Sequence, residues 1–215
     1  MKKIFVTTIG LLFIATSAFA QTLSMGVSLQ GFYFDASGTE TLKESANKTD
    51  KSEDGVVPIA SIFIEGEVAS GQTVGLEVVP YSAKLADGGM TQDDDAETAG
   101  TNTTDVNASN MLTLYVENPV DTQVPGSFVK GAISSVEIET DETTNTGVKY
   151  GDERIMGVTV GFGAKNDLPN GEGFYKVVAE ISHFEGATFN GTTGNKIDLD
   201  DFQTAAIRLS VGKSF

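Results

Sequence analysis

The sequence predicts an all-β fold, an eight-stranded antiparallel up-and-down transmembrane β-barrel. Three observations support this prediction. Apolar and polar residues alternate with a period of two in eight separate runs, and no stretch shows a convincing helical periodicity. The connections between the runs alternate between short turns and long polar segments. Glycine is abundant, with 24 residues, whereas there are only 5 prolines, a composition typical of strands and turns.

The beginning of the chain has the organisation of a secretory signal peptide. A pair of lysines is followed by an almost unbroken apolar run to Ala15, and then by small residues before Gln21. A membrane anchor is the alternative, but the run is shorter than the roughly 20 apolar residues that a spanning helix needs. We therefore expect residues 1–20 to be removed and residues 21–215 to form one barrel domain.

Each of the eight runs places apolar residues on one face and polar residues on the other. Barrels in lipid turn the apolar face outward and the polar face toward the lumen. The residues expected to face lipid are, run by run, Leu23, Met25, Val27, Leu29 and Tyr33; Ala60, Ile62, Ile64 and Val68; Val74, Leu76 and Val78; Leu112, Leu114 and Val116; Ala132, Val136 and Ile138; Val158, Val160, Phe162 and Ala164; Val177, Ala179 and Ile181; and Ala205, Ile207, Leu209, Val211 and Phe215.

The seven connections fall into two classes that alternate along the chain. Three are short turns, at Ser70-Gly71, 118–126 and 166–173. Four are long, polar and acidic, at about 35–55, 86–109, 140–154 and 186–201. Outer-membrane barrels have short periplasmic turns and longer extracellular loops. We therefore expect the four long segments outside the cell and both ends of the barrel at the periplasmic side.

The charge and the rare residue types exclude several kinds of function. The formal net charge is −16, and loss of the two signal lysines makes it −18, a surface that repels nucleic acid and tolerates cations. The chain has no cysteine, so it has neither disulfides nor a thiolate metal site. Its single histidine, His183, nearly excludes a histidine-based metal site. We expect no cofactor.

The end of the chain carries a more specific pattern. Ile207, Leu209, Val211 and Phe215 alternate with polar residues up to a terminal phenylalanine. This strand resembles the C-terminal strand of outer-membrane barrels, which the barrel-assembly machinery reads, although Lys213 stands where that family usually has an apolar residue. The long side chain of Lys213 can reach water from the membrane interface.

Taken whole, the chain from Gln21 onward resembles small bacterial outer-membrane β-barrels of the OmpA-transmembrane, OmpX and opacity-protein type. The resemblance lies in the architecture and in the terminal strand. It implies a location in the cell outer membrane of a Gram-negative bacterium, contact with outer-membrane lipid and lipopolysaccharide, and handling by the barrel-assembly machinery.

The lumen is expected to carry many charges. Strand parity places ten ionisable residues inside: Glu65, Glu67, Glu77, Glu117, Glu137, Glu139, Glu180, Lys165, Lys176 and Arg208. Side chains fill the interior of a barrel of about eight strands, and an unpaired charge there is costly. We therefore expect a charge network in which Glu180, Glu65, Glu77 or Glu137 holds Arg208, with Lys165 nearby. This network is either a closed plug or a gated path for protons or ions.

His183 is the one candidate for catalysis. It is expected to face outward near the external rim, an arrangement similar to that of outer-membrane lipid A deacylases, which pair a lipid-facing histidine with a serine two residues later. Position 185 is Glu in this sequence, and a nucleophile needs its base within hydrogen-bond reach. We therefore expect an interfacial side chain and no enzyme.

Two acidic clusters in the long segments are weak candidates for metal binding. Asp93, Asp94 and Asp95 form one cluster, and Asp198, Asp200 and Asp201 form the other. Carboxylate oxygens suit calcium, but neither cluster has the EF-hand spacing. Solvated loop tips are the simpler interpretation, and divalent cations bridging to lipopolysaccharide phosphates are the alternative.

Three functions remain open from the sequence. The first is a non-enzymatic barrel with a structural or surface-interaction role, which presents acidic extracellular loops. The second is a narrow channel for ions or small solutes. The third, a lipid-modifying barrel enzyme, is disfavoured by the missing serine beside His183.

Overall fold

The computed structural model of the chain describes residues 22–43, 46–68, 71–92, 100–143, 148–169 and 171–215. The expected signal peptide lies outside these residues, as do Ser70 of the first short turn and the cluster Asp93, Asp94 and Asp95. The regular structure of the described part is β throughout. In that part we find no helix that is long and apolar enough to cross a membrane.

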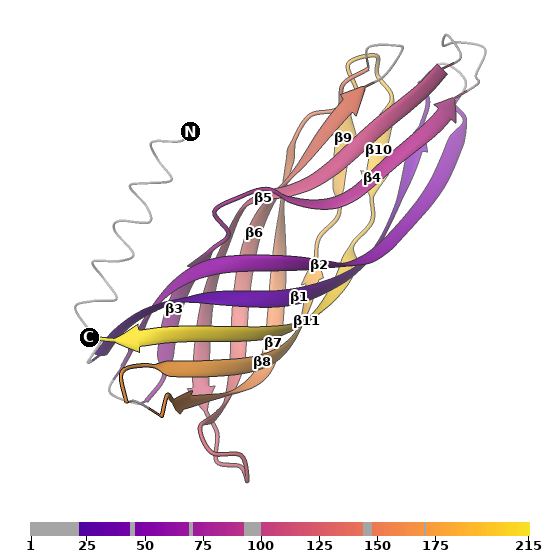
Figure 1. The fold of residues 1–215 in the computed structure, drawn as a ribbon. Helices are drawn as coiled ribbons and strands as arrows, with labels where there is room; N and C mark the ends of the chain where they lie inside the picture. The colour runs from indigo at the N-terminus through magenta and orange to yellow at the C-terminus, as the bar shows by residue number, and fades with distance from the viewer. Residues whose placement is uncertain (1–21, 44–45, 69–70, 93–99, 144–147, 170) are drawn as a thin grey trace.

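The strands are antiparallel and form a single sheet (Figure 1). Their bounds are β1 Thr22–Thr41, β2 Lys48–Glu67, β3 Thr73–Val78, β4 Ala83–Gln92, β5 Gly100–Pro119, β6 Ser127–Thr143, β7 Glu153–Asp167, β8 Phe174–Phe184, β9 Ala187–Asn190, β10 Lys196–Leu199 and β11 Phe202–Ser214.

Eight of these strands close into a ring, which confirms the predicted barrel. The order around the ring is β1, β2, β3, β5, β6, β7, β8 and β11, and β11 pairs with β1 to close it. Around the closing seam, Ser28 of β1 lies opposite Ser61 of β2 and also opposite Ser210 of β11. Each strand therefore has a neighbour on both sides, as a sheet in lipid requires.

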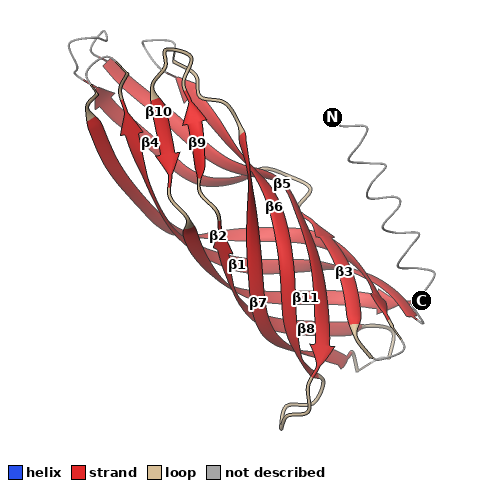
Figure 2. Cartoon of the chain, turned by 180° about the vertical axis from the view of Figure 1, so that it is seen from behind, coloured by secondary structure: helices blue, strands red, loops and turns tan. Residues whose placement is uncertain are grey.

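Three of the four long segments, expected to be loops, continue the barrel wall as strand pairs, whereas the described residues 148–152 between β6 and β7 lie outside any strand. Beyond the ring, β1 and β2 pair as far as Thr41 and Lys48, and β4 pairs with β5. The pair β9–β10 takes over from β11, because β1 pairs with β11 up to Asp35 and with β10 from Gly38. Figure 2 shows these extensions at the end opposite the short turns. The hairpins use β-pairing where sequence polarity alone indicated open loops.

The extended wall is interrupted at two neighbouring places. The chain leaves β3 after Val78 and enters β4 at Ala83, with Pro80 in the break. In β5 the register shifts between Ser109 and Leu112, where Asn110 has a left-handed φ of 49°. In the described ladders, β2 between Lys48 and Ser61 pairs with β1 alone, so the outer part of β2 has one strand neighbour.

The outward faces follow the predicted alternation in every ring strand except β6. Val27, Ile62, Val160 and Leu209, for example, are each at least 50% exposed, as a lipid-facing surface requires. In β6 the parity is reversed: Ile133 is 50% exposed, whereas Val136 and Ile138 are buried in the barrel. The prediction that Val136 and Ile138 face lipid is therefore wrong.

Candidate functional site

The interior of the ring has two halves of opposite character. At one level of the ring, the lumen-facing residue on or just beyond each strand changes from polar or small to apolar on passing away from the short turns, although aromatic rings also lie in the half near those turns. The residues at the change are Gln30 and Phe32, Ser61 and Ile59, Glu77 and Val79, Thr113 and Met111, Ser134 and Val136, Gly157 and Ile155, Ser182 and Phe184, and Thr204 and Phe202. Neighbouring strands change close to one another in register. The bore is thus divided into a polar half near the short turns and an apolar half farther from them.

The polar half contains a charge network centred on Arg208. Its guanidinium donates to Glu180 through Nε, at 3.1 Å, and through Nη2, at 2.5 Å, and it also contacts Glu77. Glu180 accepts a further bond from Lys130 Nζ at 2.8 Å. Ser61 donates to Glu77 at 2.5 Å. All five side chains are buried, and they come from five strands, so the network ties the wall together across the bore.

A second network lies nearer the short turns. Lys176 Nζ is 2.5 Å from Glu65 Oε2 and 2.7 Å from Glu117 Oε2. Lys165, at the partly exposed end of the bore, is 3.3 Å from Glu65 Oε1. The hydroxyl of Tyr115 donates to Glu65 at 2.7 Å. Glu65, which contacts Lys176, Lys165 and Tyr115, is 2% exposed.

Aromatic rings pack around the ammonium group of Lys176 and fill the space that the ion pairs leave. Its Nζ lies between 5.4 and 5.8 Å from the ring centroids of Phe63, Tyr115, Phe128 and Phe174. A cation over a ring face is attracted by the ring quadrupole, most strongly where water is excluded. Charge pairs and rings together close the bore.

The two networks are each electrically neutral in formal charge. Arg208 and Lys130 balance Glu77 and Glu180 in the first, and Lys176 and Lys165 balance Glu65 and Glu117 in the second. The sequence-based set was strongly acidic instead. A buried network with this balance leaves no charge uncompensated, which is the condition for burying ions at all.

Four corrections produce the balance. Glu137, proposed as a partner of Arg208, lies on the outward face of β6 and pairs with Arg154 at 3.1 Å. Glu139 shares that face and accepts a bond from Ser109, and Glu67 is exposed at the short-turn rim. Lys130, which the sequence reading did not include, faces the lumen because the parity of β6 is reversed.

The apolar half contains a cavity of about 300 Å³. The part of the cavity nearest the polar half is lined by Phe32, Ile59, Met111, Val136 and Phe184. Polar residues line the part farthest from the short turns. Val136, Ile138, Ile155, Phe184 and Phe189 form a buried apolar cluster beside it. The signal for this half was in the sequence, because Phe32 and Phe34 continue the lumen-facing parity of Ser28 and Gln30.

The remaining candidates lie on the outer surface. His183 is half exposed, and its Nε2 is 3.8 Å from Asp201 Oδ2. Glu185 accepts a hydrogen bond from the backbone N–H of Met156. The structure therefore places the carboxylate of Asp201 beside His183.

The second acidic cluster is divided among separate partners. Asp200 accepts a bond from Ser37 at 2.8 Å, and Asp201 accepts one from the N–H of Gly186 at 2.7 Å. Asp198 accepts a bond from Thr188 at 2.7 Å and lies 3.6 Å from Lys196, and the pKa of its carboxyl is lowered, first by that Thr188 hydroxyl. In the described part of the chain no three acidic or histidine side chains come together as metal ligands would.

A closed antiparallel ring, an apolar outer band and an ionisable lumen define a bacterial outer-membrane β-barrel. No protein-family model matches the sequence, and no curated protein matches it. The structure is similar to outer membrane protein OprG from Pseudomonas aeruginosa, with a TM-score of 0.53 and 14% identity over 92% of this chain and 97% of that one.

Two further solved barrels are more distant. Outer membrane protease OmpT from Escherichia coli has a TM-score of 0.48 and 9% identity over 91% of this chain and 97% of that one. Ail of Yersinia pestis, solved with the heparin analogue sucrose octasulfate, has a TM-score of 0.40 and 12% identity over 90% and 99%.

Proposed function

We propose that this protein is a non-enzymatic outer-membrane barrel that binds a small apolar molecule in the external half of its lumen. The observation that carries the proposal is the division of the bore. An apolar cavity of about 300 Å³ lies directly above two neutral ion-pair networks that fill the other half. Ligand pockets are typically concave, largely apolar and a few hundred Å³ in volume. A surface-interaction role then means capture of a ligand from outside the cell.

The same arrangement argues against the alternative of a narrow channel for ions or small solutes. An ion crossing the bore would meet Lys176, Glu65 and their surrounding rings, which are already paired and packed. It would then have to cross an apolar half that offers little compensation for lost hydration. The lumen charges act in this proposal as a structural plug.

The envelope partners complete the proposal. Residues 1–20 are removed on export, and the strand ending at Phe215 is read by the barrel-assembly machinery. The outer face contacts lipid and lipopolysaccharide. The bands of exposed apolar residues on β1 and β11 support the lipid contact.

Binding of the fluorescent apolar probe N-phenylnaphthylamine to purified protein tests the proposal. We expect saturable binding that falls in Met111→Gln, where an amide replaces a thioether at the pocket wall. Met156→Gln makes the same change on the lipid face, where Met156 is 45% exposed, and should leave binding unchanged. A drop of roughly fivefold is expected for loss of a buried apolar contact of this size.

Two results would refute the proposal. One is the absence of saturable probe binding to the wild-type protein. The other is a steady, large single-channel conductance in planar bilayers, which would favour the channel instead.

A further inference from the structure

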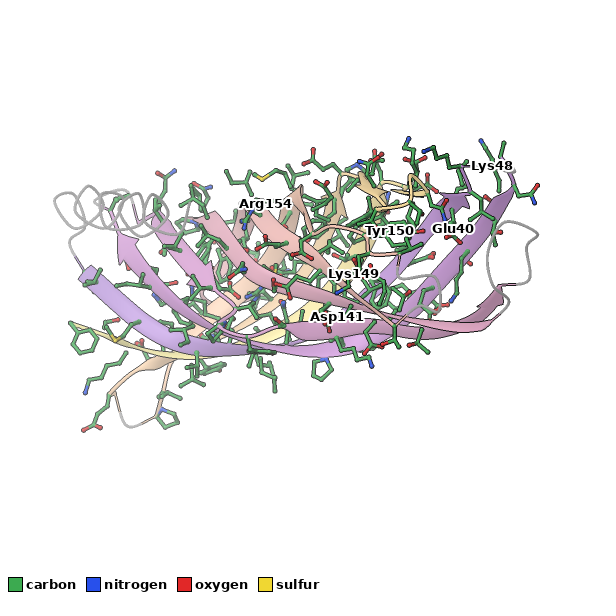
Figure 3. All side chains as sticks on the ribbon, turned by 90° about the horizontal axis from the view of Figure 1, so that it is seen from above. Glu40, Lys48, Asp141, Lys149, Tyr150 and Arg154 are labelled. Carbon is green, nitrogen blue, oxygen red and sulfur yellow. The ribbon has the colours of Figure 1, made fainter. Side chains whose placement is uncertain are left out.

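The segment Val148–Tyr150, between β6 and β7, lies along the apolar cavity, and Figure 3 labels Lys149 and Tyr150 of this segment together with Glu40. Val148 is 4% exposed, and Tyr150 packs against the cluster that contains Ile138 and Phe189. Both residues line the cavity. We call this segment the strap. It completes the wall in the region where β9 and β7 approach each other without pairing in the described ladders.

Individual hydrogen bonds hold the strap, whereas strand ladders hold other parts of the wall. The backbones of Lys149 and Thr192 join through a 2.9 Å bond from the Thr192 N–H, and the Thr192 hydroxyl accepts from the Lys149 N–H at 3.2 Å. The Tyr150 N–H donates to Glu142 at 3.1 Å. The Tyr150 hydroxyl donates to Glu40 of β1 at 2.8 Å, across the cavity. Strand ladders such as β1–β2 form other parts of the wall.

We propose that the strap is the movable wall through which ligand enters from outside, and that the Tyr150–Glu40 bond is the tie that closes it. This inference rests on the proposed function. Local opening follows the regions with the fewest cooperative hydrogen bonds. A short segment outside the ladders opens at a lower free-energy cost than two paired strands separate, and the Tyr150–Glu40 bond joins it to β1.

A second weak place in the wall provides the competing route. The outer part of β2 faces β4 without a ladder, and there the Tyr81 hydroxyl accepts a 2.6 Å bond from the N–H of Ala60. The Tyr81 hydroxyl thus bridges the wall at this place, as the Tyr150 hydroxyl does at the strap. The two tyrosines allow the same chemical change, loss of one hydroxyl, at both candidate entrances.

Stopped-flow binding of N-phenylnaphthylamine to Tyr150→Phe, Tyr81→Phe and the wild type separates the routes. In Tyr150→Phe both the association and the dissociation rate should rise by roughly five- to tenfold, the effect expected from losing one hydrogen bond. The equilibrium Kd should stay near the wild-type value, because the tie closes the pocket whether or not it is filled. Tyr81→Phe should bind and release the probe at wild-type rates.

A reversible lock gives a second measurement. The chain has no cysteine, so Lys149→Cys combined with Thr192→Cys places one disulfide between the strap and the β9–β10 turn. Oxidation should slow probe exchange by at least roughly tenfold, and reduction should restore it. Faster exchange in Tyr81→Phe alone, or unchanged exchange in the oxidised lock, overturns the strap as the entrance. Loss of wild-type equilibrium binding would instead refute the pocket itself.

Discussion

Arg208 joins two carboxylates from different strands inside the barrel. It is 5% exposed, and it joins Glu180 on the neighbouring strand β8 to Glu77 on the far side of the lumen. A planar guanidinium suits this position, because its fork of N–H donors can serve two carboxylates at once. The Lys165–Glu65 pair differs from the Arg208 pairs, because the Lys165 side chain is 26% exposed at the end of the bore.

Arg208→Met should therefore destabilise the barrel far more than Lys165→Met. The first change leaves Glu77 without its buried cation and Glu180 with Lys130 alone, and breaking such a buried pair costs about 3–5 kcal/mol. The second should cost less, because the Lys165 side chain is 26% exposed and Glu65 keeps Lys176 and Tyr115 as partners. Urea unfolding of the two variants in the same detergent measures the difference, and equal losses would show that the network does not hold Arg208 as a buried ion.

Asp198 offers a test of the β9–β10 hairpin. The Thr188 hydroxyl lowers the pKa of its carboxyl below the ordinary 3.8, with Lys196 and Lys48 acting in the same direction. A lowered pKa in the folded state stabilises the hairpin above the ordinary value, and this contribution is lost as the pH falls below 3.8 through the lowered pKa. In Thr188→Val the pKa of Asp198 should rise toward its ordinary value, as an NMR titration would show. A titration identical to that of the wild type contradicts the assignment.

At the scale of the strand, glycines opposite aromatic residues shape the lumen. Each aromatic lies over a glycine directly across the ladder, where a side chain would collide with the ring. The pairs are Gly26 with Phe63, Gly75 with Tyr115, Gly163 with Phe128, Gly212 with Phe174 and Gly157 with Phe184. At the closing seam Gly26 and Gly212 are themselves opposite, and the rings of Phe63 and Phe174 meet over them at 6.3 Å between centroids.

Gly212→Ala should consequently weaken the barrel, whereas Gly131→Ala should not. A methyl group at Gly212 would meet the ring of Phe174, whereas at Gly131 no atom lies within 4 Å. Overpacking of this kind costs about 1–3 kcal/mol, and an unhindered Gly→Ala change is neutral or slightly stabilising. Heat-modifiable gel mobility and urea midpoints report both. Equal stability of the two variants would mean that the ring of Phe174 can give way.

Over the whole molecule, the closed ring separates three environments that one chain serves at once. Lipid meets the outward apolar band, the ion-pair networks fill the half of the bore near the short turns, and the apolar cavity occupies the half that extends into the hairpins. The extension raises the wall beyond the ring (Figures 1 and 2), and residues of β1, β2 and β10 in the extension line the cavity. Closure of the ring at β1–β11 is the condition for all three.

A seam disulfide tests that closure. Ser28 and Ser210 are direct partners across β1 and β11, with their hydroxyl oxygens 2.8 Å apart. In Ser28→Cys with Ser210→Cys, a disulfide should form on oxidation and stabilise the barrel by about 2–4 kcal/mol. The same protein kept reduced is the control. Failure of the bond to form in folded protein would mean that β1 and β11 do not meet in this register.

Local pattern was sufficient for the strands, the lipid face and the short turns. Alternation in runs such as Met25, Val27 and Leu29 depends only on the period of a strand and on the need to cover the barrel with apolar side chains. Together with the terminal run to Phe215 and the alternation of short and long connections, these runs predicted the number of strands. The side chains on the inner face of the ring were identified in this way on every strand except β6.

The tertiary structure decided what those inner side chains do. Partners in the lumen come from strands distant in sequence, such as Arg208 and Glu77, and their meeting depends on the register of every intervening ladder. The rule that apolar residues face lipid also fails where the bore itself becomes apolar. Because Val136 is apolar, the rule assigned it to the lipid face and so reversed the two faces of β6. With the faces reversed, Glu137 was predicted inside and Lys130 was left out of the lumen. Sequence alone determined a barrel with a charged lumen. Only closure of the ring could determine that the charges balance in one half and leave an apolar cavity in the other.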